Sequence, residues 1–450
     1  MKKNILKFLS VLFCVALFMT GCATVSDIYG KDGKAIYYND IQYYQGQVVK
    51  AGDYLYYGNG YTAVDAEGFD YGTAASTGYL ARLNVEQSFK YKDDVKEEDK
   101  DKTSPLGIEK VNDKLTGYQK QDMFALGGFI YFTSANTHKT DKLENDYTQV
   151  SLFRVRFNGD DFEEIGTFRS DEKSIITTQK GSDGNYYYIV YAPTSNKEVY
   201  NLSSIKIGDS IGDTKTLAED VKTLAICDSD STEKNIVYST ITKSAEGKET
   251  TTIKTVDFAT GATEDKYLGG SADAKIEFID RVGDIVFYSH EDKGIKEVYY
   301  KNLVESDNGF DGAKSHKFYN APSIKNIEKA GNGYIFVSTS SSSLMYKNLE
   351  ISEDAKLLLT TEEYKDVLFV DGDYIYYSNE TTIARVNVVD STKENIVTMK
   401  KIVSGQCGYV DGYIYFFAQL ETGEEDTENT DFYMYRTDKQ GRYQLVGQTK

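Results

Sequence analysis

One short segment recurs along this chain and limits the folds that are open to it. Its clearest copy is VDGDYIYYSN at 370–379, where a Gly/Asp turn precedes a run of Tyr and Ile. Gly adopts positive φ without steric cost, and aromatic and β-branched residues favour strands. Each copy is therefore interpreted as a tight turn that leads into a strand. The other copies are AGDYLYYGN (51–59), LGGFIYFTS (126–134), SDGNYYYIVYA (182–192), EKNIVYST (233–240), VGDIVFYSH (282–290), NGYIFVSTS (332–340) and VDGYIYFFA (410–418).

The composition of these strands indicates that both of their faces are buried. Tyr374 to Tyr377 are all large, with no alternation of polar and apolar residues, whereas a sheet with one face in water would alternate. From residue 184 onward the copies are spaced by 40 to 51 residues, which suits one four-stranded blade each. The pattern predicts an all-β protein, a β-propeller of four-stranded blades, with eight blades preferred and seven possible. A β-sandwich is the alternative.

The first 21 residues have the pattern of a signal peptide rather than of a folded element. Three lysines precede an apolar run at 8–19, which is too short to span a bilayer. The run ends in Met19-Thr20-Gly21-Cys22, which resembles the lipobox of bacterial lipoproteins. That resemblance implies cleavage before Cys22 and a diacylglyceryl thioether on its sulfur, with acyl chains such as palmitate. Its alternative is a secretory signal whose cysteine is incidental.

The remaining chain is expected to form one domain. Residues 22–45 are interpreted as a lipidated tether with a possible closing strand, AIYYND at 35–40, that completes the last blade or packs outside it. Residues 46–450 form the propeller. Residues 91–102 are so rich in charge that they are expected to be a mobile insertion. The following stretch, 104–115, can form either a short helix or a strand of the first blade.

The net charge limits the binding partners that are expected, and the cysteine positions indicate whether a disulfide forms. The net charge is −19, which argues against nucleic acid and against close adhesion to an anionic membrane. A monomer is expected. Cys227 and Cys407 precede the turns of different repeats, so two buried free thiols are expected rather than a disulfide.

The sequence carries no complete catalytic or metal-binding pattern. Gly208-Asp209-Ser210-Ile211-Gly212 matches a nucleophile elbow, but its surroundings predict a hairpin between two strands. His138 and His290 fall in repeats that are far apart in a ring, and both are expected at the surface. No cofactor and no metal are predicted, and the chain is expected not to be an enzyme.

The mature chain resembles the Tyr-rich β-propeller lipoproteins of Gram-positive bacteria, which carry the same Gly-Asp-Tyr-Ile-Tyr-Tyr theme. The resemblance implies the fold and a location on the outer face of the cytoplasmic membrane, and it transfers no catalytic residue. The function expected is binding of a protein, a peptide or an envelope glycan. The alternative is an extracellular enzyme that cleaves glycan or peptide.

Loop lengths suggest which face of the ring binds. Connections between the first and second strands are uniformly short, whereas those between the second and third strands vary in length. Rigid scaffolds tend to carry function on such variable loops. Tyr offers contact area at low entropic cost, so the ligand-binding candidates there are Tyr61, Tyr71 and Tyr147.

Overall fold

A computed structural model gives the fold of the protein. It describes residues 27–30, 33–43, 46, 48–59, 79–85, 90–91, 109–112, 123–135, 148–171, 173–194, 199–243, 249–267, 275–292, 294–304, 310, 316–351, 354–402, 407–419 and 433–448.

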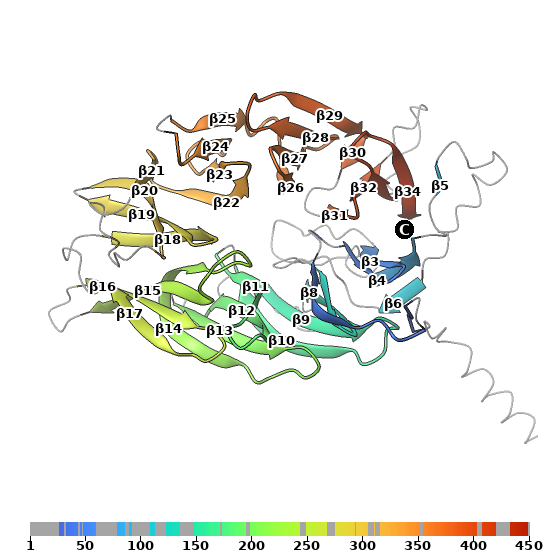
Figure 1. Ribbon diagram of the computed structural model, residues 1–450, viewed down its shortest axis with the longest axis horizontal. Coiled ribbons are helices and arrows are strands. Elements are labelled where there is room, and N and C mark those ends of the chain that lie inside the picture. The colour runs from blue at the N-terminus through green and yellow to red at the C-terminus, as the bar shows by residue number, and fades with distance from the viewer. Residues whose placement is uncertain are drawn as a thin grey trace, which may run out of the picture.

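The described strands form a ring of antiparallel blades (Figure 1). They belong to seven sheets, one of which spans two blades, so the ring has eight blades. At most junctions the first strands of neighbouring blades contact one another. The first blade comprises β2 (Val48–Ala51), β3 (Tyr54–Asn59), β4 (Tyr79–Asn84) and β6 (Glu109–Asn112), and the second comprises β7 (Phe124–Gly127), β8 (Phe129–Ala135), β9 (Thr148–Arg156) and β10 (Glu163–Ser170). The third comprises β11 (Ile175–Lys180), β12 (Tyr186–Pro193), β13 (Tyr200–Ile207) and β14 (Lys215–Ile226). The fourth blade shares β14 as its first strand and adds β15 (Asn235–Lys243), β16 (Glu249–Asp257) and β17 (Thr263–Tyr267).

The second half of the ring repeats the same order. The fifth blade comprises β18 (Lys275–Val282), β19 (Ile285–Asp292), β20 (Ile295–Asn302) and β21 (His316–Tyr319), and the sixth comprises β22 (Ile324–Ala330), β23 (Gly333–Ser338), β24 (Leu344–Asn348) and β25 (Lys356–Leu359). The seventh comprises β26 (Asp366–Asp371), β27 (Tyr374–Ser378), β28 (Thr382–Asn387) and β29 (Lys393–Thr398). The eighth comprises β30 (Lys401–Ile402), β31 (Gly408–Val410), β32 (Tyr413–Gln419), β33 (Tyr433–Thr437) and β34 (Tyr443–Gln448). The prediction of an all-β propeller is confirmed. Residues 109–112 form a strand, so the strand alternative for this stretch is the correct one.

The core lies between blades, as the absence of alternation predicted. Buried apolar side chains of the described residues gather in eight clusters, and each cluster joins two neighbouring blades. One of them closes the ring, since it packs Val48 and Tyr57 of the first blade against Val410 and Phe417 of the eighth.

Two blades share a strand. The first half of β14 pairs with β13, and its second half pairs with β15. Asp220 has a φ of 55° at the bend between the halves. The third and fourth blades are therefore joined by one continuous strand.

The N-terminal strand has a position that the sequence did not suggest. β1 (Tyr38–Tyr43) pairs with β7, the first strand of the second blade. It becomes an additional strand on the inner side of that blade and does not complete the last blade. The backbone of an innermost strand has one unpaired edge, and β1 pairs with it.

A two-residue strand links the first blade to the last. β5 (Lys90–Tyr91) pairs with β34, the outermost strand of the eighth blade. Tyr91, the first residue of the expected mobile insertion, is therefore paired. Residues 92–102 lie outside the described part of the chain.

Arginines on third strands lie over aromatic rings, and Arg82 also joins two blades. Arg82 is fully buried, and its guanidinium donates to Glu109 at 2.7 Å and to the carbonyl of Phe157 in the next blade at 2.9 Å. It also lies 4.5 Å from the centre of the Tyr54 ring. A third-strand arginine over an aromatic ring recurs at Arg154, Arg385 and Arg436.

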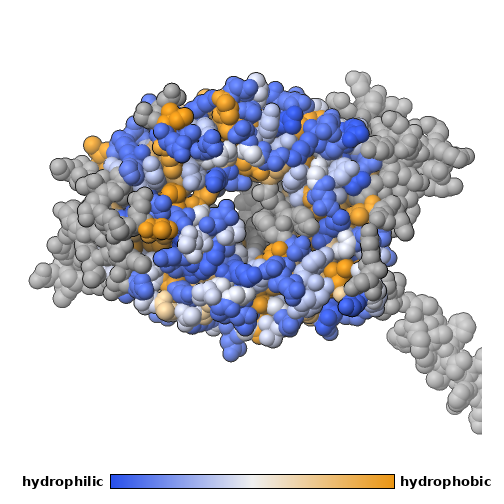
Figure 2. Space-filling model, viewed as in Figure 1, coloured by the Kyte–Doolittle hydropathy of each residue, from blue (hydrophilic) through white to orange (hydrophobic). Residues whose placement is uncertain are grey.

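Antiparallel pairing gives the ring two different faces. The turn face carries the connections between first and second strands, such as Gly52–Asp53 and Gly331–Asn332, and those between third and fourth strands. The loop face carries the connections between second and third strands, such as 339–343, and those between blades, such as 360–365. The described residues visible in Figure 2 are mainly hydrophilic, with apolar residues scattered among them.

Candidate functional site

The candidate site begins at a bulge in the first strand of the sixth blade. Lys325 pairs with Val337 and Glu328 with Ile335, so β22 contains one residue more than β23 over this interval. Asn326 has a φ of 52° within the bulge. Bulges of this kind redirect side chains and are frequent beside functional sites.

The bulge lines a cavity of about 650 Å³ between the sixth and seventh blades. Its lining includes Ser342 and Tyr364, which belong to connections on the loop face, so we call it the loop-face pocket. Ligand pockets commonly have volumes of about 300–1,000 Å³. The complete lining is Lys325, Asn326, Ile327, Glu328, Ile335, Val337, Ser342, Thr361, Tyr364, Lys365, Asp366 and Val367.

Glu328 is the chemically distinctive group of this pocket. Its side chain is half-buried, and desolvation raises the pKa of its carboxyl to about 7. Burial disfavours the charged form because the surrounding protein solvates a carboxylate less well than water does. Near neutral pH the carboxyl therefore exists in both forms, able to donate as well as to accept a hydrogen bond.

Asp280 of the fifth blade holds the bulge in place. Its carboxylate accepts hydrogen bonds from the main-chain N–H groups of Arg281 and Ile327, and the latter residue precedes Glu328. Burial raises the pKa of Asp280 to about 6 despite these bonds. The carboxylate of one blade thus positions the pocket residue of the next.

Charged side chains surround the apolar walls. Lys325 and Lys365 are exposed, and Lys365 lies 3.5 Å from Glu380 in an ion pair. Tyr364 is buried, and its hydroxyl donates to the carbonyl of Ser342 at 3.1 Å. The pocket therefore combines four aliphatic side chains with a polar and charged remainder.

Replacing Glu328 by glutamine is expected to stabilise the protein at alkaline pH. The folded pKa of about 7 lies above the ordinary value of 4.5, so the favourable contribution of Glu328 is complete below pH 4.5 and is lost as the pH rises through 7. At pH 8 the glutamine variant should be more stable by roughly 2–3 kcal/mol, and at pH 4 the difference should vanish. Chemical denaturation at both pH values measures this, with Glu362→Gln at an exposed position as the control. An unchanged difference between the two pH values would show that Glu328 is well solvated.

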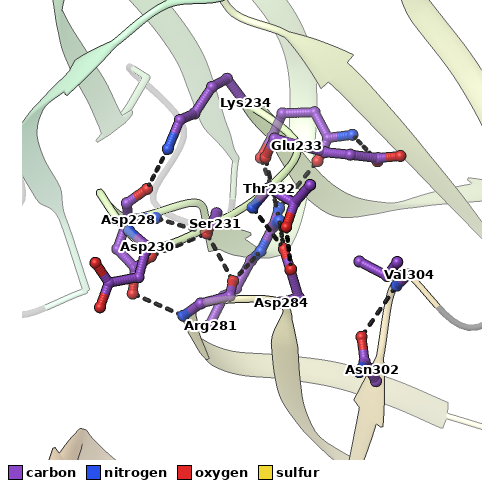
Figure 3. A network of polar contacts seen from close by, with 12 residues as sticks. Asp228, Asp230, Ser231, Thr232, Glu233, Lys234, Arg281, Asp284, Asn302 and Val304 are labelled. Carbon is purple, nitrogen blue, oxygen red and sulfur yellow. Dashed lines mark hydrogen bonds and ion pairs between the residues drawn. The ribbon is translucent and has the colours of Figure 1, made fainter.

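A denser polar cluster lies on the turn face between the fourth and fifth blades (Figure 3). Arg281 is buried there, and its guanidinium donates to the carbonyls of Gly283, Asn235 and Glu233 at 2.9–3.1 Å. Asp228 accepts from the N–H of Gly283 at 2.8 Å. These donors and acceptors satisfy one another's hydrogen bonds across the junction, so the cluster joins the fourth blade to the fifth.

The structure places only some of the residues selected from the sequence. Cys22, Tyr61, Tyr71, Tyr147 and His138 lie outside the described residues. Cys227 and Cys407 are free and buried, as predicted, and burial raises their thiol pKa values to about 11 and about 12. Gly208–Gly212 lies in the hairpin between β13 and β14, also as predicted.

The prediction for His290 was wrong. It is buried, and its ring packs edge-on against Tyr299 with centroids 5.9 Å apart. It lies inside β19, a strand that continues to Asp292, whereas the repeat pattern ended the strand just before it.

Sequence reasoning missed the pocket, although a signal was present. Glu328 and Asp280 both stand three residues before the turn glycine, where other copies carry Phe369, Phe124 or Val49. An acidic residue at an otherwise apolar position of a buried strand marks such a site.

The described residues contain neither a metal-binding group nor a helical membrane span. No three or more His, Cys, Asp or Glu side chains come together there in a way that could hold an ion. No helix in this part of the chain combines the length and the apolar character needed to cross a bilayer.

No protein-family model and no curated protein matches the chain. Solved structures resemble it at low identity. A prolyl endopeptidase is 10% identical, with 89% of this chain and 55% of that chain covered and a TM-score of 0.42. Dipeptidyl peptidase 4 of Porphyromonas gingivalis is 10% identical, with 90% and 59% covered and a TM-score of 0.45. The β-propeller domain of the trilobed protease from Pyrococcus furiosus is 11% identical, with 72% and 93% covered and a TM-score of 0.39.

The similarity to these solved structures bears on the fold alone. The chain spans little more than half the length of the prolyl endopeptidase and of dipeptidyl peptidase 4. The expectation that the chain is not an enzyme is contradicted, because these similar structures are peptidases. A propeller fold is therefore no argument against catalysis. At this distance they assign no activity to the chain either. The strand order of the described residues establishes that the chain is a β-propeller protein.

Proposed function

We propose that this protein is a lipid-anchored binding protein on the outer face of the cytoplasmic membrane, and that its loop-face pocket binds a segment of a protein or peptide. The observation that carries the proposal is the pocket itself. A cavity of about 650 Å³, lined by aliphatic and polar side chains together, contains the Glu328 carboxyl, whose pKa is raised to about 7.

The chemistry of the lining favours a peptide over a glycan. Ile327, Ile335, Val337 and Val367 provide an interior that suits an apolar side chain. Tyr364 is the one aromatic residue of the lining, and it is buried rather than presented as a stacking surface. Glu328 and the lysines at the entrance can pair with the polar backbone or with charged neighbours of the inserted side chain.

The proposed anchor rests on the sequence of the N-terminus. Basic residues, an apolar run of signal-peptide length and Cys22 after Thr20-Gly21 follow the order of a lipoprotein signal. Two acyl chains give stable attachment, whereas a single chain is marginal.

Blocking the pocket entrance tests the proposed binding. Thr361 is exposed and lines the pocket, whereas its exposed neighbour Glu362 does not. A library of short peptides and a set of peptidoglycan fragments would be screened by calorimetry against the purified protein. Thr361→Trp should weaken binding of the selected peptide at least about tenfold, equivalent to ~1.4 kcal/mol. Glu362→Trp should leave it unchanged.

Two results would contradict the proposal. Equal affinities for the two tryptophan variants would place the binding surface elsewhere on the ring. Selection of peptidoglycan fragments alone would show that the ligand is a glycan.

A further inference from the structure

The segment before β1 lies on the turn face of the ring. The side chain of Ile28 is buried beside Gly52, in the turn between β2 and β3. Ile36 donates its N–H to the carbonyl of Ile28 at 3.1 Å, and Tyr29 forms a bridge with Ala35. The chain therefore makes a small hairpin against this turn.

The next residues are fixed to further turns of the same face. Gly52 donates its N–H to the Tyr38 hydroxyl at 2.9 Å. The Tyr37 hydroxyl donates to Asp209 at 2.6 Å, in the turn between β13 and β14. Hydrogen bonds to two blades thus hold the segment where it enters the ring.

β1 then runs from the turn face toward the loop face. Tyr38 pairs with Gly127 at the turn end of β7, and Tyr43 pairs with Phe124 at the beginning of β7. Ile28, which precedes this strand, consequently lies on the turn face of the ring.

Cys22 lies only six positions before Ile28, so the connection spans six residue steps. Fully extended, they reach about 20 Å, at 3.3–3.6 Å per residue. A six-residue strand such as β23 is itself about 20 Å long. The segment from Cys22 to Ile28 would be fully extended after it crossed the thickness of the ring. It would therefore be too short to pass around the rim to the loop face.

We infer that the turn face of the ring is apposed to the lipid surface and that the loop face, with its pocket, is directed away from the membrane. The inference rests on the proposed lipidation of Cys22. It assigns to the turn face a lipid surface as its neighbour, and it leaves the loop face accessible to partners from outside.

The tether imposes this orientation, and the charge of the turn face does not. Asp53, Asp209 and Asp284 belong to its turns, and carboxylates are repelled by anionic lipids. Because the constraint is a covalent length, the orientation should persist when salt screens that repulsion.

Fluorescence energy transfer on vesicles tests the orientation. Asn332 and Ser341 are both exposed and flank β23, one on the turn face and the other on the loop face. Full-length lipidated protein carrying Asn332→Cys or Ser341→Cys would be labelled with a donor and reconstituted into vesicles of phosphatidylglycerol and phosphatidylcholine with a headgroup acceptor. Protein without an added cysteine serves as the control for the buried Cys227 and Cys407.

Transfer should be several-fold more efficient from position 332 than from position 341, at low and at high salt alike. Equal or reversed efficiencies on vesicle-bound protein would overturn the orientation and leave the proposed anchor intact. Failure of the lipidated protein to float with vesicles would contradict the anchor instead.

Discussion

A Cys22→Ala protein is expected to incorporate no labelled fatty acid and to keep its signal peptide. The acyl chains are proposed to be attached through the Cys22 sulfur, which alanine lacks. Each buried CH₂ group contributes about 0.8 kcal/mol to membrane attachment, so removal of both chains should release any processed protein from the membrane. Metabolic labelling and membrane fractionation measure the two effects.

The N-terminal segment supplies a matched control. Cys14 lies within the apolar run of the same signal and outside the Met19–Cys22 pattern. Cys14→Ala should therefore be labelled like the wild type. Labelling that survives Cys22→Ala but not Cys14→Ala would refute the proposed lipidation site.

Replacing Arg281 by methionine is expected to cause a large loss of stability. Methionine retains much of the volume but none of the donors, so the carbonyls of Asn235 and Glu233 lose their bonds to the guanidinium. Breaking a buried ionic network by removing one partner typically costs about 3–5 kcal/mol. Urea denaturation followed by circular dichroism measures the free energy of unfolding.

Arg385 provides the comparison for this variant. It is half-buried, and it pairs with Glu394 at 2.6 Å and with the Tyr376 hydroxyl at 3.2 Å. Arg385→Met should cost only about 1 kcal/mol, because solvent replaces part of what is lost. Similar losses for both variants would indicate that water reaches the junction between the fourth and fifth blades.

The repeated turn and strand were enough to predict the propeller because they recur at the scale of a blade. Each copy supplies a glycine turn and a strand with two buried faces, and eight such copies can bury those faces only against one another. The same reasoning could not locate β1, because its residues 38–43 have no partner nearby in the sequence. Pairing at an open sheet edge depends on the tertiary arrangement, and so does the pairing of β5 with β34.

The candidate pocket was beyond sequence reasoning for a similar reason. Thirty-eight residues separate Glu328 from Asp366, and packing of two blades brings both to one cavity. The raised pKa of Glu328 comes from burial, which no local pattern encodes. The acidic residue at an apolar repeat position was nevertheless visible, and it indicates where such a search should start.

The position of β1 also determines how the ring would bear a pulling force. Tension between a lipid anchor and a partner held on the loop face would enter through β1, along the direction of its pairing with β7. The backbone hydrogen bonds of that pairing would then be sheared together rather than broken one after another. Contacts of the N-terminal segment with Gly52 of the first blade and Asp209 of the third would share this load, which would then pass on through the apolar junctions on either side of the second blade.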